Sequence, residues 1–105
     1  MPNSTKWKIR FPDESTQTEY DTYFLIYPRQ KHVKESFEND VTTDPFYHPT
    51  PRRIVALKGR LAGKYRYGKS ETRIVYEPVE ITKTVYPLET KKITDVSYKK
   101  RSKIR

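Results

Sequence analysis

Several kinds of chemistry are excluded by what this sequence lacks. None of its 105 residues is cysteine, so disulfide bonds and thiol catalysis are ruled out. No apolar run is long enough to span a membrane. The opening segment, MPNSTKWKIRF, lacks the apolar core of a secretory signal. From these absences we expect a cytoplasmic protein that has no membrane partner.

Motifs for binding metals and nucleotides are also missing. The two histidines, His32 and His48, do not have the spacing of metal ligands, and no cysteine accompanies them. The three glycines do not form a phosphate-binding loop. We therefore predict neither a metal nor a cofactor. His48, in a proline-rich segment, stays open as a candidate general base.

Aromatic side chains and positive charge are abundant instead. Aromatic residues make up 13% of the chain, which favours one folded domain over residues 1–105. The net charge of +9 is segregated: residues 1–51 hold six Lys/Arg and eight Asp/Glu (−2), and residues 52–105 hold sixteen and five (+11). This asymmetry favours a phosphate-bearing or acidic partner. The alternative is a general solubility charge.

The first half of the chain has the pattern of one strand followed by two helices. Apolar and basic residues alternate over residues 6–11, which is the period of a half-buried strand. Thr16 and Glu19 have the spacing of a capping box, so we expect a helix over residues 17–26. Apolar residues four apart predict a second helix over residues 29–41, and three prolines then predict a loop. The expected apolar faces are Tyr20, Tyr23, Phe24 and Tyr27 on the first helix and Val33, Phe37 and Val41 on the second.

The second half of the chain has the shorter period of strands. We predict these over residues 53–59, 63–69, 72–77 and 81–89. The third is expected at the centre of the sheet, because Ile74-Val75-Tyr76 is continuously apolar. Helices that precede a run of strands are typical of the α+β class. The predicted fold is an N-terminal strand, a two-helix hairpin and then an antiparallel β-sheet, with a basic tail over about residues 99–105.

Three cations are expected to share one face of this sheet. Alternation places Lys64 and Arg66 on one side of their strand and the neighbouring tyrosines on the other. A turn over residues 68–71 then brings Arg73 within cross-strand reach of the same face. Such a cluster of cations indicates phosphate binding, and the alternative is an ordinary solvent-exposed strand face. The other residues expected on this face or at its edge are Lys91, Lys92 and Tyr98.

Five short motifs also follow one another in a fixed order. They are Leu57-x-Gly59, Lys64-x-Arg66, Arg73-Ile74-Val75-Tyr76, Thr84-Val85-Tyr86, and the segment from Lys91-Lys92 to Val96-Ser97-Tyr98. In this order, over about residues 6–100, the chain resembles the RelE/ParE superfamily, the toxins of bacterial type II toxin–antitoxin systems. The resemblance implies a RelE-like fold with the architecture of microbial ribonucleases.

Resemblance to the RelE branch implies a metal-independent endoribonuclease that cuts mRNA in the A site of the ribosome. In the implied reaction a ribose 2′-hydroxyl attacks the adjacent phosphate, which leaves a 2′,3′-cyclic phosphate and a 5′-hydroxyl. The catalytic residues implied by position are Lys64, Arg66, Arg73, Lys92 and Tyr98. The further cations that we predict to bind RNA are Lys58, Arg60, Lys69, Lys91, Lys99, Lys100 and Arg101.

The resemblance also implies a role for each catalytic residue. Arg66 or Lys64, at positions that are commonly lysines, would assist removal of the 2′ proton. Arg73 would hold the charge of the phosphorane. Lys92, at a position that is usually arginine, would assist the leaving 5′-oxygen, and Tyr98 would stack on or orient the nucleotide.

The partners implied are a cognate antitoxin, the 70S ribosome and mRNA. The antitoxin is expected to be acidic or amphipathic and to lie on the sheet or across the helical hairpin. Three alternatives remain open at this point: a ParE-like inhibitor of DNA gyrase, a non-catalytic RNA- or ribosome-binding protein, and a toxin homologue without activity.

Overall fold

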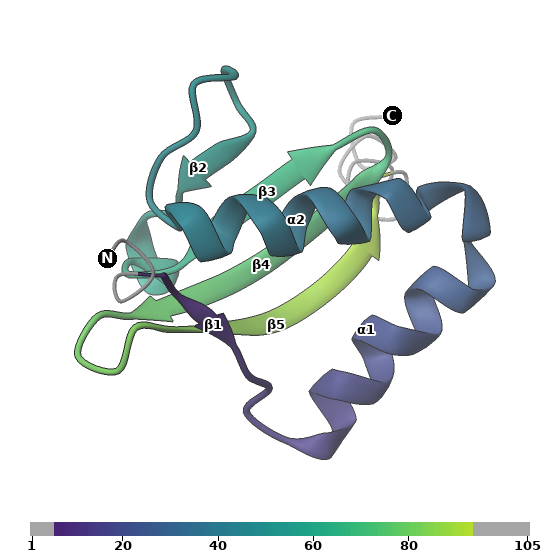
Figure 1. Cartoon of the computed structure of the whole chain (residues 1–105), viewed down its shortest axis with the longest axis horizontal. Coiled ribbons are helices and arrows are strands. Elements are labelled where there is room, and N and C mark those ends of the chain that lie inside the picture. The colour runs from purple at the N-terminus through teal and green to yellow at the C-terminus, as the bar shows by residue number, and fades with distance from the viewer. Residues whose placement is uncertain (1–5, 94–105) are drawn as a thin grey trace.

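The computed structural model describes residues 6–93 and has two α-helices laid against one face of a five-stranded sheet (Figure 1). This is the predicted α+β class, and the order of strands and helices is also as predicted. The elements are β1 (Lys8–Ile9), α1 (Glu14–Ile26), the 3₁₀ turn η2 (Pro28–Gln30), α2 (Lys31–Thr43), β2 (Ile54–Ala56), the 3₁₀ turn η3 (Gly59–Leu61), β3 (Tyr65–Lys69), β4 (Thr72–Val79) and β5 (Thr84–Lys92).

The sheet is mixed, with strand order β1-β5-β4-β3-β2. The last four strands form the expected antiparallel meander, and β4 lies at its centre as predicted. The sequence did not predict how the first strand pairs, and in the structure β1 runs parallel to β5. The amides of Lys8 and Arg10 donate to the carbonyls of Lys83 and Val85 at 3.0 Å. The N-terminal strand therefore satisfies the free edge of the last one.

Helix α1 begins earlier than the sequence predicted, and a different residue caps it. The side chain of Asp13 accepts a hydrogen bond from the amide of Thr16 at 2.8 Å and another from its hydroxyl at 2.6 Å. The prediction that Thr16 caps the helix was therefore wrong. A carboxylate at this position both satisfies a free amide and lies at the positive end of the helix dipole.

The core lies between the two helices and the sheet, and it is built largely from aromatic rings. In α2, Val33, Phe37 and Val41 are fully buried, as the four-residue spacing predicted. The ring of Phe37 packs edge-on against Tyr67 at 5.3 Å and Tyr76 at 5.6 Å. The other buried core residues are Trp7, Tyr20, Tyr23, Phe24, Ile74 and Val85. Because the helices cover one face of the sheet, the side chains of the opposite face are left for other contacts.

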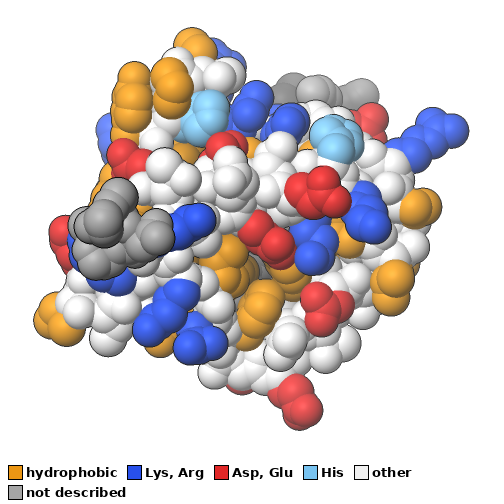
Figure 2. Space-filling model, viewed as in Figure 1, with side chains coloured by type: hydrophobic (Ala, Val, Ile, Leu, Met, Phe, Trp, Pro, Cys, Tyr) orange, Lys and Arg blue, Asp and Glu red, His pale blue; other side chains and the backbone are white. Residues whose placement is uncertain are grey.

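The helix-covered side of the molecule carries no single sign of charge. In Figure 2, which is viewed from this side, acidic and basic side chains are interspersed over the surface. One ion pair of this surface joins Lys34 to Glu38 across one turn of α2 at 3.2 Å. We therefore expect the excess positive charge of the second half of the chain on the face of the sheet that the helices leave open.

Candidate functional site

The strand register places two arginines on the face of the sheet that the helices leave open. Arg66 lies opposite Val75, and Arg73 lies opposite Gly68. Directly opposed residues share a face, as do residues two apart on one strand. Their neighbours in the other set, Tyr67, Ile74 and Tyr76 among them, are buried beneath the helices. Arg66 and Arg73 are thus brought together on the open face.

Arg73 is held in place by the hairpin between β3 and β4. Its guanidinium donates to the carbonyls of Thr72 at 2.8 Å and Ser70 at 3.2 Å. Its side chain lies directly over Gly68, where an added Cβ would stand 3.1 Å from Cδ and Nε of the arginine. Burial, and then the positive charge of Arg66, lower the pKa of Arg73 from its usual value. Two like charges are therefore held close together, and a bound anion would relieve their repulsion.

Neither arginine has an acidic partner among the described residues. Within residues 6–93 every ion pair on the sheet involves a lysine instead. The Nε atom of Arg66 is buried and has no hydrogen-bond partner in this part of the chain. A buried donor without an acceptor is costly, so such a group calls for an explanation. An oxyanion placed between the two guanidinium groups would offset the positive charge that no acidic side chain in this part of the chain offsets.

Two lysines flank the arginines on the same face, and each has a glutamate beside it. Lys64 lies 3.9 Å from Glu77, and Lys91 lies 3.3 Å from Glu89. Lys91 stands directly opposite Arg73, on the neighbouring strand β5. Among the described residues, the open face thus combines guanidinium groups without an acidic partner at its centre with paired ammonium and carboxylate groups around them.

Two predicted cations face the helices: Lys92, which was expected with this cluster, and Lys69, which was expected to bind RNA. Lys69 and Lys92 both lie in register with buried Thr72. The ammonium of Lys69 donates to the hydroxyl of Ser36 at 2.7 Å. That of Lys92 lies 5.0 Å above the ring of Tyr27 and 3.5 Å from Glu71. The structure does not bring either lysine to Arg73.

A β-bulge explains why Lys91 rather than Lys92 stands beside Arg73. The register of β5 shifts so that Tyr76 pairs with Pro87 while Val75 pairs with Glu89. Leu88 is the extra residue, and from there on it reverses which side chains face the helices. Without it, simple alternation from Val85 would place Lys92 on the open face.

The other cations predicted to bind RNA fall in two places. Lys58 and Arg60 are exposed in the connection between β2 and β3, around η3. The remaining candidates lie outside the described residues; they are Tyr98, Lys99, Lys100 and Arg101.

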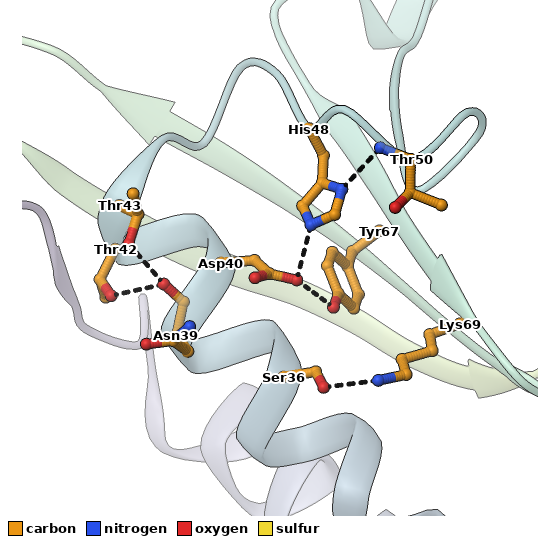
Figure 3. Close-up of polar contacts among 9 residues, drawn as sticks. All are labelled: Ser36, Asn39, Asp40, Thr42, Thr43, His48, Thr50, Tyr67 and Lys69. Atoms are coloured by element: carbon orange, nitrogen blue, oxygen red, sulfur yellow. Dashed lines mark hydrogen bonds and ion pairs between the residues drawn. The ribbon is translucent and has the colours of Figure 1, made fainter.

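His48, the candidate general base, belongs to a different cluster on the helix side (Figure 3). Its Nε2 lies 3.3 Å from a carboxylate oxygen of Asp40, which also accepts a hydrogen bond from Tyr67 at 2.6 Å. Its Nδ1 accepts from the amide of Thr50 at 3.0 Å. Both ring nitrogens are therefore engaged, and burial together with Asp40 raises the pKa of Tyr67. The cluster ties the loop after α2 to the sheet, on the face opposite Arg73.

The described residues offer neither a metal site nor a membrane-spanning helix. Among residues 6–93 no three acidic or histidine side chains come together in a way that could hold a metal ion. In the described residues no helix has the length and apolar character needed to cross a bilayer.

Sequence reasoning did not place three residues on this face: Gly68, Glu77 and Glu89. The alternation of β4 was a signal for Glu77, which lies two residues beyond Val75. Gly68 carried the weak signal of a glycine inside a strand, which often marks a close approach. Nothing in the sequence marked Glu89, because its orientation depends on the bulge at Leu88.

Comparison with known proteins gives a match at the level of structure alone. No protein-family model matches the chain, and neither does any curated protein. Among solved structures, the toxin–antitoxin complex RelBE2 from Mycobacterium tuberculosis is similar, with a TM-score of 0.61 and 20% sequence identity. The similarity covers 83% of this chain and 98% of that one. The chain therefore has the fold of a RelE-like toxin, as its motifs predicted.

Proposed function

We propose that this protein is the toxin of a type II toxin–antitoxin system and that it inhibits translation in the cytoplasm by cutting mRNA in the ribosomal A site. The observation that carries the proposal is the pair of guanidinium groups on the open sheet face. Arg66 and Arg73 have no acidic partner among the described residues, and Arg66 has a buried donor without an acceptor. The fold is that of a structure solved as a toxin–antitoxin complex.

The two arginines suit the charge that develops during RNA cleavage. Attack of the 2′-hydroxyl on the adjacent phosphorus gives a phosphorane whose oxygens carry additional negative charge. Arg73 is already fixed by two backbone carbonyls, so it needs little reorganisation to meet that charge. Preorganised donors of this kind typically contribute about 10²–10³-fold in rate. Lys64, Lys58 and Arg60 would hold the neighbouring phosphates.

Two of the implied catalytic residues, Lys92 and Tyr98, are not among those that carry the proposal. Lys92 faces Tyr27 and Glu71, so the contact expected of it at the reacting phosphate falls to Lys91, opposite Arg73. Tyr98 lies outside the described residues, and its role in orienting the nucleotide stays a prediction from the resemblance.

An antitoxin partner is supported by an apolar cleft across the helical hairpin. This cleft has a volume of about 440 Å³, and Leu25 at its edge is 79% exposed. Its apolar floor and basic rim suit an amphipathic helix with acidic flanks. The lining residues are Asp21, Phe24, Leu25, Pro28, Lys31 and Lys34.

The proposal is tested by inducing the protein alone in a bacterial host and mapping mRNA 5′ ends by primer extension. We expect new cuts within translated codons, and none in an untranslated copy of the same message. Arg73→Ala should abolish the cuts. Arg29→Ala, which removes the same charge from an exposed site on η2, should not.

Intact mRNA during growth arrest would contradict the proposal. It would direct attention to the alternatives, first inhibition of DNA gyrase and then binding of the ribosome without cleavage. Cuts that persist unchanged in Arg73→Ala would show that the arginine pair is not the site.

A further inference from the structure

We propose that Glu89 and Lys91 are the general base and the general acid of the cleavage reaction. This inference rests on the proposed function and assigns the two proton transfers that the arginines cannot perform. A guanidinium group keeps its proton throughout the accessible pH range. Arg66 and Arg73 can therefore stabilise charge, but another pair of groups must remove the 2′ proton and protonate the leaving oxygen.

The two side chains stand on the open face beside the arginines. On β5 they are separated by Thr90, which is buried against the helix side. Lys91 lies directly opposite Arg73, and Glu89 lies opposite Val75. Val75 is in turn paired with Arg66, so Glu89 and Arg66 lie in one row across three strands. Adjacent strands are about 4.8 Å apart, so Arg66 and Glu89 are about 10 Å apart at the backbone, a span that their side chains can close around one phosphodiester.

Both side chains are accessible in the resting protein, and they contact each other. The ammonium of Lys91 lies 3.3 Å from a carboxylate oxygen of Glu89. Their side chains are 43% and 49% exposed, so substrate can reach them. An ion pair this exposed stabilises a fold little. A structural role therefore gives a weak account of it.

Glu89 and Lys91 together account for every proton transfer of the reaction. The Glu89 carboxylate takes the proton of the 2′-hydroxyl while the 2′-oxygen forms a bond to phosphorus. The bond from phosphorus to the 5′-oxygen breaks, and the ammonium of Lys91 gives that oxygen a proton. The products are a 2′,3′-cyclic phosphate, a 5′-hydroxyl, a neutral carboxylic acid and a neutral amine. The acid then returns its proton to the amine across their contact, which restores the resting state without another reactant.

The same face provides a matched control. Glu77 is also paired with a lysine, Lys64, and its side chain is 44% exposed. It lies two residues beyond Val75 on β4, farther along the strand from Arg73. Replacing Glu77 changes the charge of the face as much as replacing Glu89 does, without removing the proposed base.

The test measures single-turnover cleavage of a short mRNA on 70S ribosomes, with the codon to be cut in the A site. Two forms of the mRNA are used, one with the natural 5′-oxygen at the cut and one with a bridging 5′-sulfur. A thiolate leaves without being protonated, so the sulfur form does not need a general acid. The variants are Glu89→Gln, Lys91→Met and Glu77→Gln, each checked by thermal melting.

Each variant has a distinct expected result. Glu89→Gln should slow cleavage of both mRNAs by about 10²-fold or more and remove the fall in rate on the acid side of the pH profile. Lys91→Met should slow the oxygen form by about 10²-fold and cleave the sulfur form at nearly the wild-type rate. Glu77→Gln should stay within about threefold of wild type on both, because it loses only an exposed ion pair.

Two results would contradict the assignment of Glu89 as the base or Lys91 as the acid. A Glu89→Gln protein with the wild-type rate and pH profile overturns the base, and a Lys91→Met protein that sulfur does not rescue overturns the acid. In both cases the wild type still cuts, so the proposed function stands. A wild type that cuts neither mRNA removes the proposed function, and this inference with it.

Discussion

Replacing Gly68 with alanine should separate activity from stability. The new Cβ would lie 3.1 Å from Cδ and Nε of Arg73 and 3.2 Å from Cζ, so the arginine side chain must move away. Displacing a catalytic group by about 1 Å costs on the order of 10²-fold in rate. That loss corresponds to about 2.7 kcal/mol of transition-state stabilisation. The fold itself should change little, because removing a glycine from a strand gains roughly 0.5–1 kcal/mol and offsets the local crowding.

The assay pairs single-turnover mRNA cleavage with thermal unfolding, and Gly63→Ala provides the opposite case. Gly63 has φ of 95°, and an added Cβ there would meet no atom within 4 Å. Alanine at this position should destabilise the fold by about 1–2 kcal/mol through backbone strain alone. In a domain of this size the melting temperature then falls by about 4–8 °C per kcal/mol.

Gly68→Ala should therefore have the melting temperature of wild type but cleave mRNA slowly. Gly63→Ala should have a lower melting temperature but cleave mRNA at a nearly normal rate at temperatures where it is folded. If Gly68→Ala cleaves at the wild-type rate, the position of Arg73 over Gly68 does not matter for the reaction, and the reasoning from this contact fails.

Three further predictions concern the rest of the molecule. Tyr67→Phe should lower the free energy of unfolding, measured in urea, by about 1–2 kcal/mol, because it removes the 2.6 Å hydrogen bond to half-buried Asp40. Tyr47→Phe, at a 64% exposed site, should leave the free energy of unfolding unchanged. Hydrogen bonds from Thr16 lower the pKa of Asp13 from 3.8, so its contribution is present above that pH and is lost as the pH falls through the lower folded value. Asp13→Asn keeps the cap and should show less loss of melting temperature between about pH 6 and pH 2.5 than wild type does; an equal loss would contradict the role of Asp13. Lys92→Met should cut mRNA within about fivefold of wild type, since among the described residues its ammonium pairs with exposed Glu71 and contacts the ring of Tyr27 on the helix side. A loss as large as that of Lys91→Met would restore Lys92 to the site.

The parts of the fold that the sequence predicted are those set by local periodicity. Val33, Phe37 and Val41 repeat every four residues, and a helix can bury that spacing along one stripe. Alternation likewise placed Arg66 on the open face with its tyrosine neighbours beneath the helices. The turn predicted over residues 68–71 is a two-residue connection between β3 and β4, and Arg73 lies on the expected face because the register of a short hairpin follows from its turn.

What the sequence could not predict depends on contacts distant along the chain or on one irregular residue. The extra residue in β5, Leu88, exchanges the orientations of Lys91 and Lys92, and its own side chain gives no sign of it. The parallel pairing of β1 depends on which sheet edge stays free after the meander has formed. Asp13 and Thr16 are both good capping residues, and local propensity does not choose between them.

The pairing of β1 with β5 also has a consequence for how the chain folds. Lys8 pairs with Thr84, a separation of 76 residues (84 − 8), so the first strand finds its partner only after nearly all the described chain has been made. Contacts between such distant residues form slowly, because a long loop must close first. Strand β5, which is made late, also carries Glu89 and Lys91. During synthesis the sheet and the face that carries these two residues are therefore completed together, and only after β5 has been made.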